Sequence, residues 1–69
     1  MTTTQTWTVT GMTCGHCVAS VTEEVQEIPG VTGVDVVLES GTVTVTSEQP
    51  LADDTVREAV EEAGYRLAG

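Results

Sequence analysis

The stretch VDVVLESGTVTVT, residues 34–46, decides the fold. Apolar and polar side chains alternate over residues 34–38 and again over residues 42–46, which is the pattern of two half-buried strands. Ser40 and Gly41, which lie between the two runs, are typical turn residues. Two alternating runs joined by a short turn that contains glycine predict an antiparallel hairpin.

An amphipathic helix is predicted on each side of this hairpin. Before it, apolar residues are spaced 3, 4 and 3 apart from position 18 to position 28, and Pro29-Gly30 stops the helix, which begins at Gly15. After it, Asp53 and Asp54 suit the first turn of a second helix, and Gly64 suits the left-handed position beyond its end. The expected inward-facing residues are Val18, Val21, Val25 and Ile28 in the first helix, and Val56, Ala59, Val60 and Ala63 in the second.

The two ends of the chain supply the outer strands. Residues 5–10 alternate and predict a first strand, residues 65–67 predict a short last strand, and the TTTQ stretch at residues 2–5 is expected to fray. The order strand-helix-strand-strand-helix-strand is a ferredoxin-like βαββαβ pattern of the α+β class. We therefore expect one domain over residues 1–69, with its core at about 5–68. A four-stranded antiparallel sheet would carry both helices on one face and expose its other face to solvent.

The charge of the chain limits its partners. The chain of 69 residues contains eleven acidic residues and only two basic ones, Arg57 and Arg66, which gives a net charge of −9. Phosphate backbones and anionic lipid surfaces repel such a protein, so we expect no nucleic acid partner, whereas a basic protein would be attracted. No apolar run is long enough to insert into a membrane and no secretory signal is apparent, so a cytoplasmic location is expected.

The candidate site is the stretch GMTCGHC, residues 11–17, which contains Cys14 and Cys17, the only two cysteines. Cys14 is expected in the loop after the first strand, and Cys17 in the first turn of the first helix. Backbone N–H groups and the helix dipole favour anions at that end, so the pKa of each thiol should be lowered. Thiolates serve both metal binding and disulfide exchange, so the motif alone leaves both chemistries open.

Three known uses of such a motif fit this chain less well. Thioredoxin-like exchange belongs to a longer fold, although a dithiol redox protein stays an alternative. A closed zinc site needs four protein ligands, and this chain has two cysteines and His16, whose side chain should point away from a metal held by its neighbours. A c-type haem motif requires histidine where Val18 stands. An open site with two surface thiolates remains, and it favours Cu(I), the first choice of soft thiolates among the physiological ions.

GMTCGHC on a βαββαβ pattern, with Gly64-Tyr65 after the second helix, resembles the heavy-metal-associated domain. The resemblance covers about residues 6–67 and is strongest to small bacterial copper chaperones of the CopZ type. It implies that Cys14 and Cys17 bind Cu(I) and pass it by ligand exchange to the metal-binding domain of a copper-transporting P-type ATPase. It also implies a link to a copper-responsive repressor.

The residues around the cysteines have supporting roles in this interpretation. Met12 should pack between sheet and helix and steady the loop, although its thioether is a second candidate Cu(I) donor. Thr13 and Gly15 should set the loop conformation. His16 is either an exposed residue that tunes the thiolates or a third ligand in a copper-bridged homodimer. Tyr65 should close the second helix and, by resemblance, shield the metal loop.

The sequence thus predicts a cytoplasmic Cu(I) metallochaperone without enzymatic activity. The family also contains amino-terminal domains of ATPases and mercuric-ion carriers, but the short chain and the lack of a secretory signal favour a freestanding cytoplasmic carrier. The alternatives are a dithiol redox protein and a zinc or mercury carrier of the same fold.

Overall fold

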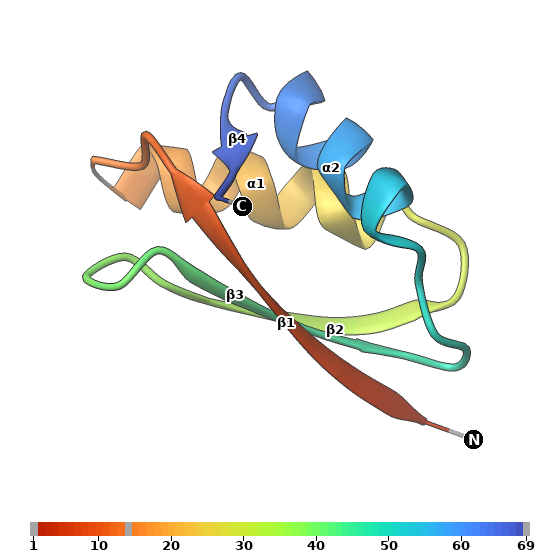
Figure 1. Ribbon diagram of the computed structural model, residues 1–69. Coiled ribbons are helices and arrows are strands. Elements are labelled where there is room, and N and C mark those ends of the chain that lie inside the picture. Colours follow the sequence, from red (N-terminus) through yellow and green to blue (C-terminus); the bar gives the residue numbers. More distant parts are fainter. Residues whose placement is uncertain (1, 14, 69) are drawn as a thin grey trace.

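The predicted order of elements is confirmed. The computed structural model describes residues 2–13 and 15–68. The four strands form one antiparallel sheet in the order β2-β3-β1-β4, and both helices lie on the same face of it (Figure 1). Along the chain, the elements are β1 (Thr3–Thr10), α1 (Gly15–Gln26), β2 (Val31–Val37), β3 (Thr42–Ser47), α2 (Asp53–Glu62) and β4 (Arg66–Leu67).

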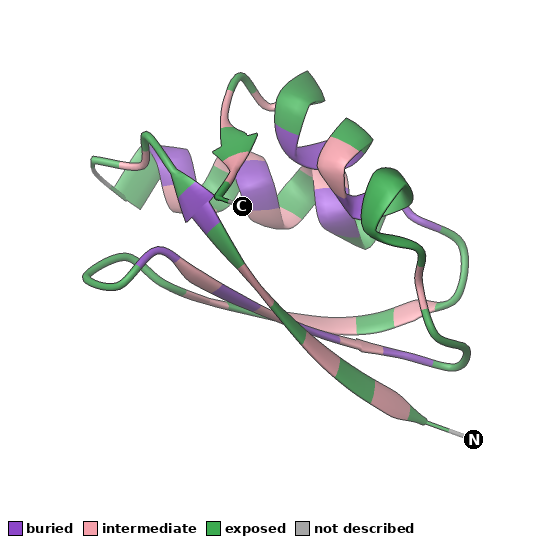
Figure 2. Cartoon of the chain, viewed as in Figure 1, coloured by how far each residue is buried: buried purple, intermediate pink, exposed green. Residues whose placement is uncertain are grey.

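The core lies between the sheet and the two helices, where the buried residues gather (Figure 2). It consists mostly of valine. Removing these apolar side chains from water is the main stabilising contribution in a chain of this size. The inward stripe of α1 starts at Cys17 rather than at the predicted Val18, which is only half-buried. The buried cluster contains Val9, Val21, Val25, Ile28, Val43, Val45, Val56, Ala59 and Val60.

The hairpin forms as predicted, but its first strand is shifted. β2 begins at Val31 and ends at Val37, so the prediction that Leu38 belongs to the strand is wrong. The backbone N–H of Gly41 donates to the carbonyl oxygen of Val37 at 2.9 Å, which closes the turn over the residues between them. Leu38 therefore lies in the turn and is 37% exposed.

The start of the chain is better ordered than predicted. Residues 3–5 belong to β1, where Thr3 pairs with Ser47 of β3. The side-chain amide of Gln5 donates to the carbonyl oxygen of Leu51 at 3.2 Å and accepts from its backbone N–H at 2.7 Å. This pair of bonds fastens the start of β1 to the segment before α2, so the expected fraying does not extend to these residues.

The last strand carries the end of the chain back to the end of β1. Gly64 has a φ of 92°, the left-handed conformation expected after α2. β4 then pairs with β1 through Val9 opposite Leu67 and Thr10 opposite Arg66, and Tyr65 precedes the strand instead of starting it. Neither helix is long and apolar enough to cross a membrane in the part of the chain that the structure describes.

Candidate metal centre

The loop between β1 and α1 lies against the segment that follows α2. Gly11 has a φ of 93°, and a Cβ atom placed on it would lie 3.4 Å from Cδ1 of Tyr65. The Tyr65 ring therefore lies close to the first residue of the loop. A side chain at position 11 would be strained by the positive φ, and its Cβ atom would fill the space beside the ring, so glycine suits this position.

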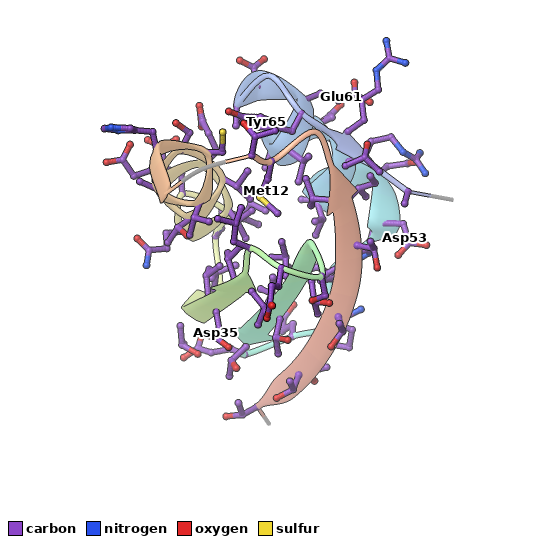
Figure 3. All side chains as sticks on the ribbon, turned by 90° about the vertical axis from the view of Figure 1, so that its left-hand side faces the viewer. Met12, Asp35, Asp53, Glu61 and Tyr65 are labelled. Carbon is purple, nitrogen blue, oxygen red and sulfur yellow. The ribbon has the colours of Figure 1, made fainter. Side chains whose placement is uncertain are left out.

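Met12 and Tyr65 both connect the loop to the core. Both side chains are half-buried and pack against the buried cluster. Figure 3 shows that Met12 turns inward from the loop, toward the space between the sheet and the helices. This is the packing position that we expected for Met12, and the flexible thioether suits such an irregular space.

Cys17 lies in the first turn of α1 and is only 8% exposed. Sequence reasoning placed it as a surface thiolate, and in this respect the structure differs. Cys17 lies four residues before Val21, so both side chains lie on the helix face that points to the core. The Oγ1 atom of Thr13 is 3.9 Å from the Cys17 sulfur, in a weak hydrogen bond for which either atom can be the donor.

The other predicted site residues differ in exposure. Gly15 and His16, which start α1, are exposed, in contrast to Cys17 one residue later. Cys14 lies outside the described residues, so its place in the site rests on its position three residues before Cys17 in the sequence. The structure brings Thr13 and Cys17 together, and it brings Tyr65 to the loop through Gly11.

The amino-terminal end of α1 suits an anion. Its first turn contains no acidic residue, and the unpaired N–H groups and dipole of a helix favour negative charge there. No group of three or more His, Cys, Asp or Glu side chains that could hold a metal occurs within residues 2–13 and 15–68. A site built from these residues alone would therefore offer two such ligands at most.

The groove between the two helices carries a different kind of surface from the amino-terminal end of α1. An open groove between the end of α1 and α2 has Ile28, Pro29 and Ala59 among its apolar residues, and five glutamates line it: Glu24, Glu27, Glu58, Glu61 and Glu62. A hydrogen bond with Glu27 is the main cause that raises the pKa of Glu24 above its usual 4.5, and desolvation and the neighbouring carboxylates add to it. The sequence alone did not predict that these carboxylates gather on one surface.

The Thr13 contact is a feature of the site that sequence reasoning missed. The sequence predicted only that Thr13 sets the loop conformation. The available signal was its spacing, since Thr13 stands four residues before Cys17 at the start of a helix. Side chains at such a spacing meet on a helix surface, but Thr13 precedes the helix, so only the structure shows the contact.

Comparison with known proteins agrees with this fold. Copper chaperone CopZ from Staphylococcus aureus (strain JH9) is 41% identical over 58 residues, which cover 83% of this chain and 85% of that protein. Among solved structures, a CopZ metallochaperone superposes with a TM-score of 0.88 at 36% identity, over 96% of this chain and 100% of the other. A copper binding domain from HMA7, a P-type ATPase, superposes with a TM-score of 0.85 at 27% identity, over 94% and 89%.

The sequence profile of the heavy-metal-associated domain matches residues 6–66, a range that runs from β1 into β4 and includes the whole GMTCGHC stretch. The element order, the strand order and the position of the cysteine loop agree with that assignment. The chain therefore belongs to the heavy-metal-associated domain family.

Proposed function

We propose that this protein is a cytoplasmic metallochaperone that carries Cu(I) on the thiolates of Cys14 and Cys17. The observation that carries the proposal is the position of Cys17 in the first turn of α1, at a helix end without acidic residues. Two soft thiolates satisfy Cu(I) in a near-linear arrangement, whereas they leave Zn(II) short of its preferred four ligands. The ion is cargo, and this chain's part is to hold it without enclosing it.

The surroundings of the site support transfer rather than storage. Gly15 and His16 are both exposed, and a Cβ atom placed on Gly15 would meet nothing within 4 Å, so a partner can approach the loop at these two residues. Met12 and Tyr65 tie the loop to the core from within, which keeps the site in place while a partner approaches. A third thiolate from the partner can then join the ion before one of the first two leaves.

We further propose that the acceptor is the metal-binding domain of a copper-transporting P-type ATPase. The likeness to a copper binding domain from a P-type ATPase supports this, because two related domains can exchange an ion between matching thiolate pairs. The net charge of −9 would favour an acceptor with a basic surface and would speed the encounter.

The test of the site assignment is competition for Cu(I) against a chelator of known affinity under reducing conditions. We expect tight binding of one ion by the wild-type protein and its loss in the double variant Cys14→Ser/Cys17→Ser. Tight binding by the folded double variant would overturn the assignment. Native mass spectrometry of the loaded protein would report in the same experiment whether copper bridges two chains.

The remaining alternatives predict other results. A dithiol redox protein would turn over a disulfide substrate, so turnover by the metal-free protein would replace the carrier proposal. A zinc or mercury carrier would retain that metal, and not copper, after purification under reducing conditions. Transfer is tested by mixing the loaded protein with the acceptor domain and following which partner holds copper.

A further inference from the structure

We infer that the first half of β1, residues 3–7, is a self-association edge, on which the same strand of a second copy of this chain pairs in antiparallel orientation. The inference does not depend on the proposed function. It uses backbone groups at the start of β1, whereas the metal loop follows the other end of that strand. Two copies joined in this way would therefore keep both metal loops free.

The sheet leaves one side of β1 unpaired along this half. β4 pairs only with Val9 and Thr10, and the backbone N–H of Ala68 donates to the carbonyl oxygen of Thr8 at 2.8 Å. Within residues 2–13 and 15–68, no strand pairs with residues 3–7 on that side. Figure 1 shows that this half of β1 runs away from both helices, so the helices do not cover it.

The backbone groups of Thr4 and Thr6 point toward the unpaired side. In an antiparallel strand, the N–H and C=O of one residue face one neighbour, and those of the next residue face the other. The N–H of Val9 donates to the carbonyl oxygen of Gly41 at 2.7 Å on the β3 side, whereas Thr8 accepts from the β4 side. Alternation back from Thr8 places the groups of Thr6 and Thr4 on the β4 side, where the described residues provide no partner.

The two edges of the sheet differ in how they are protected against such pairing. β2, the opposite edge, has a register shift between Val31 and Gly33 and an exposed charge at Asp35. Irregularities and charges of this kind discourage pairing between sheet edges. Residues 2–10 contain no charged residue and no proline, and β1 pairs with β3 without a register shift. The start of β1 is therefore a regular edge that can accept another strand.

A second copy suits this edge because β1 is uncharged and can pair with itself. The chain has a net charge of −9, and α2 alone contains five acidic residues, so other surfaces of two copies repel each other. Within the fold, β1 already places Thr4 opposite Thr46 and Thr6 opposite Thr44. Thr4 opposite Thr6 of the second copy would repeat this threonine pairing, with about four backbone hydrogen bonds. Such a small interface predicts a weak dimer, with a Kd of roughly 0.1–1 mM.

Hydrogen exchange of single amides in the metal-free, reduced protein tests the inference without any substitution. The amides of Thr4 and Thr6 should become protected as protein concentration rises to about 1 mM, together with dimer formation in sedimentation. The effect should grow with salt, because screening weakens the repulsion between the copies. The amide of Gln5, which lies opposite Val45 and faces β3, is the internal control and should be protected at every concentration.

Thr6→Pro removes an N–H from the unpaired side and leaves the bonds between β1 and β3 in place. It should weaken self-association by at least about tenfold, whereas the control Thr6→Val, which keeps the N–H, should associate as the wild type does. A protein that stays monomeric, or a dimer in which Thr4 and Thr6 exchange as in the monomer, would overturn the inference.

The double variant Cys14→Ser/Cys17→Ser separates this dimer from a copper-bridged one. Because the β1 edge contains neither cysteine, the double variant should associate as the wild type does without metal. A dimer that forms only with Cu(I) and both cysteines would overturn the inference and leave the proposed function intact. Loss of Cu(I) binding by the wild type would instead overturn the proposed function and leave the amide protection unchanged.

Discussion

The two helices begin in opposite ways, although each follows a strand and covers the same face of the sheet. The first turn of α2 contains Asp53 and Asp54, so the chain places its own negative charge at that helix end. The first turn of α1 contains no acidic residue and instead holds Cys17. Both helix ends favour a negative charge. At α2 the aspartate side chains supply it, whereas at α1 a thiolate can supply it.

This difference separates a structural helix end from a functional one. At α2, Asp53 accepts a hydrogen bond from Nε1 of Trp7 at 3.0 Å, and Asp54 pairs with Arg57 at 2.8 Å. These contacts use the local charge to join α2 to β1 and to support its first turn. At α1 no acidic side chain occupies the first turn, so under the proposed function this helix end would stabilise the negative charge of the thiolates and their metal complex.

The largest expected effect comes from removing the thiolate of α1 alone. Cys17→Ser should weaken Cu(I) binding by more than about a hundredfold, because loss of a direct ligand costs more than loss of an outer partner. Chelator competition measures the effect. Asp53→Asn, which changes the charge at the other helix end, is the control and should leave the Cu(I) affinity unchanged. Equal losses in both variants would contradict the division of roles between the two helices.

The next effect comes from giving α1 the charge that α2 has. His16→Asp should stabilise the helix by about 0.3–1 kcal/mol through the dipole, as measured by denaturant unfolding of the metal-free protein. The same carboxylate should repel the anionic copper complex and weaken Cu(I) binding by up to about tenfold. His16→Asn removes the imidazole without adding charge. Equal Cu(I) affinity in the Asp and Asn variants would show that the absence of an acidic side chain at the start of α1 has no role in binding.

A smaller effect is expected from removing the charge of α2. Asp53→Ala should lower the free energy of unfolding by about 1 kcal/mol, because both the dipole interaction and the bond from Trp7 are lost. Asp54→Ala should cost less, since its pair with Arg57 is exposed, at 87% for Asp54 and 44% for Arg57. Urea unfolding measures both variants. A greater loss in Asp54→Ala would show that the Trp7 bond contributes little.

The smallest effect concerns the crowded carboxylates in the groove between the two helices. The raised pKa of Glu24 means that the folded state binds its proton more tightly than the unfolded chain. Its ionised form is therefore destabilising, and this penalty is absent below the usual pKa of 4.5 and develops as pH rises through the raised folded pKa. Glu24→Gln should raise the melting temperature slightly at pH 7, and the gain should vanish at pH 4. A gain that persists unchanged at pH 4 would contradict the electrostatic cause.

Local patterns were sufficient to predict most of the fold. Alternation identified β1 and β3, apolar spacing identified both helices, and Gly64 marked the end of α2, because each of these signals depends on neighbouring residues. The errors arose where the structure depends on contacts between residues that are far apart in the sequence. The order of residues 3–5 depends on Leu51, which is 46 positions from Gln5, and no local pattern contains that contact.

The candidate site was predictable in its residue types but less so in its geometry. The motif named Cys14 and Cys17, and the helix signal placed Cys17 in the first turn. The burial of Cys17 depends on how α1 is rotated against the sheet. The predicted inward stripe was right at Val21, Val25 and Ile28 but wrong at its first member, because Cys17 is buried and Val18 is only half-buried. An expected surface sulfur is therefore a buried one.

The packing of Gly11 against Tyr65 has a consequence for how the protein is made. The first strand and the last strand are joined across almost the whole chain, as in the bond from the Thr10 hydroxyl to the Arg66 carbonyl oxygen, 56 positions apart. Contacts of such long range form late, since a large loop must close first. During synthesis the cysteines thus emerge well before their loop acquires its support. A chain still bound to the ribosome would therefore carry both thiols before their loop is supported. Under the proposed function, full Cu(I) affinity would appear only after the last residues have paired with β1.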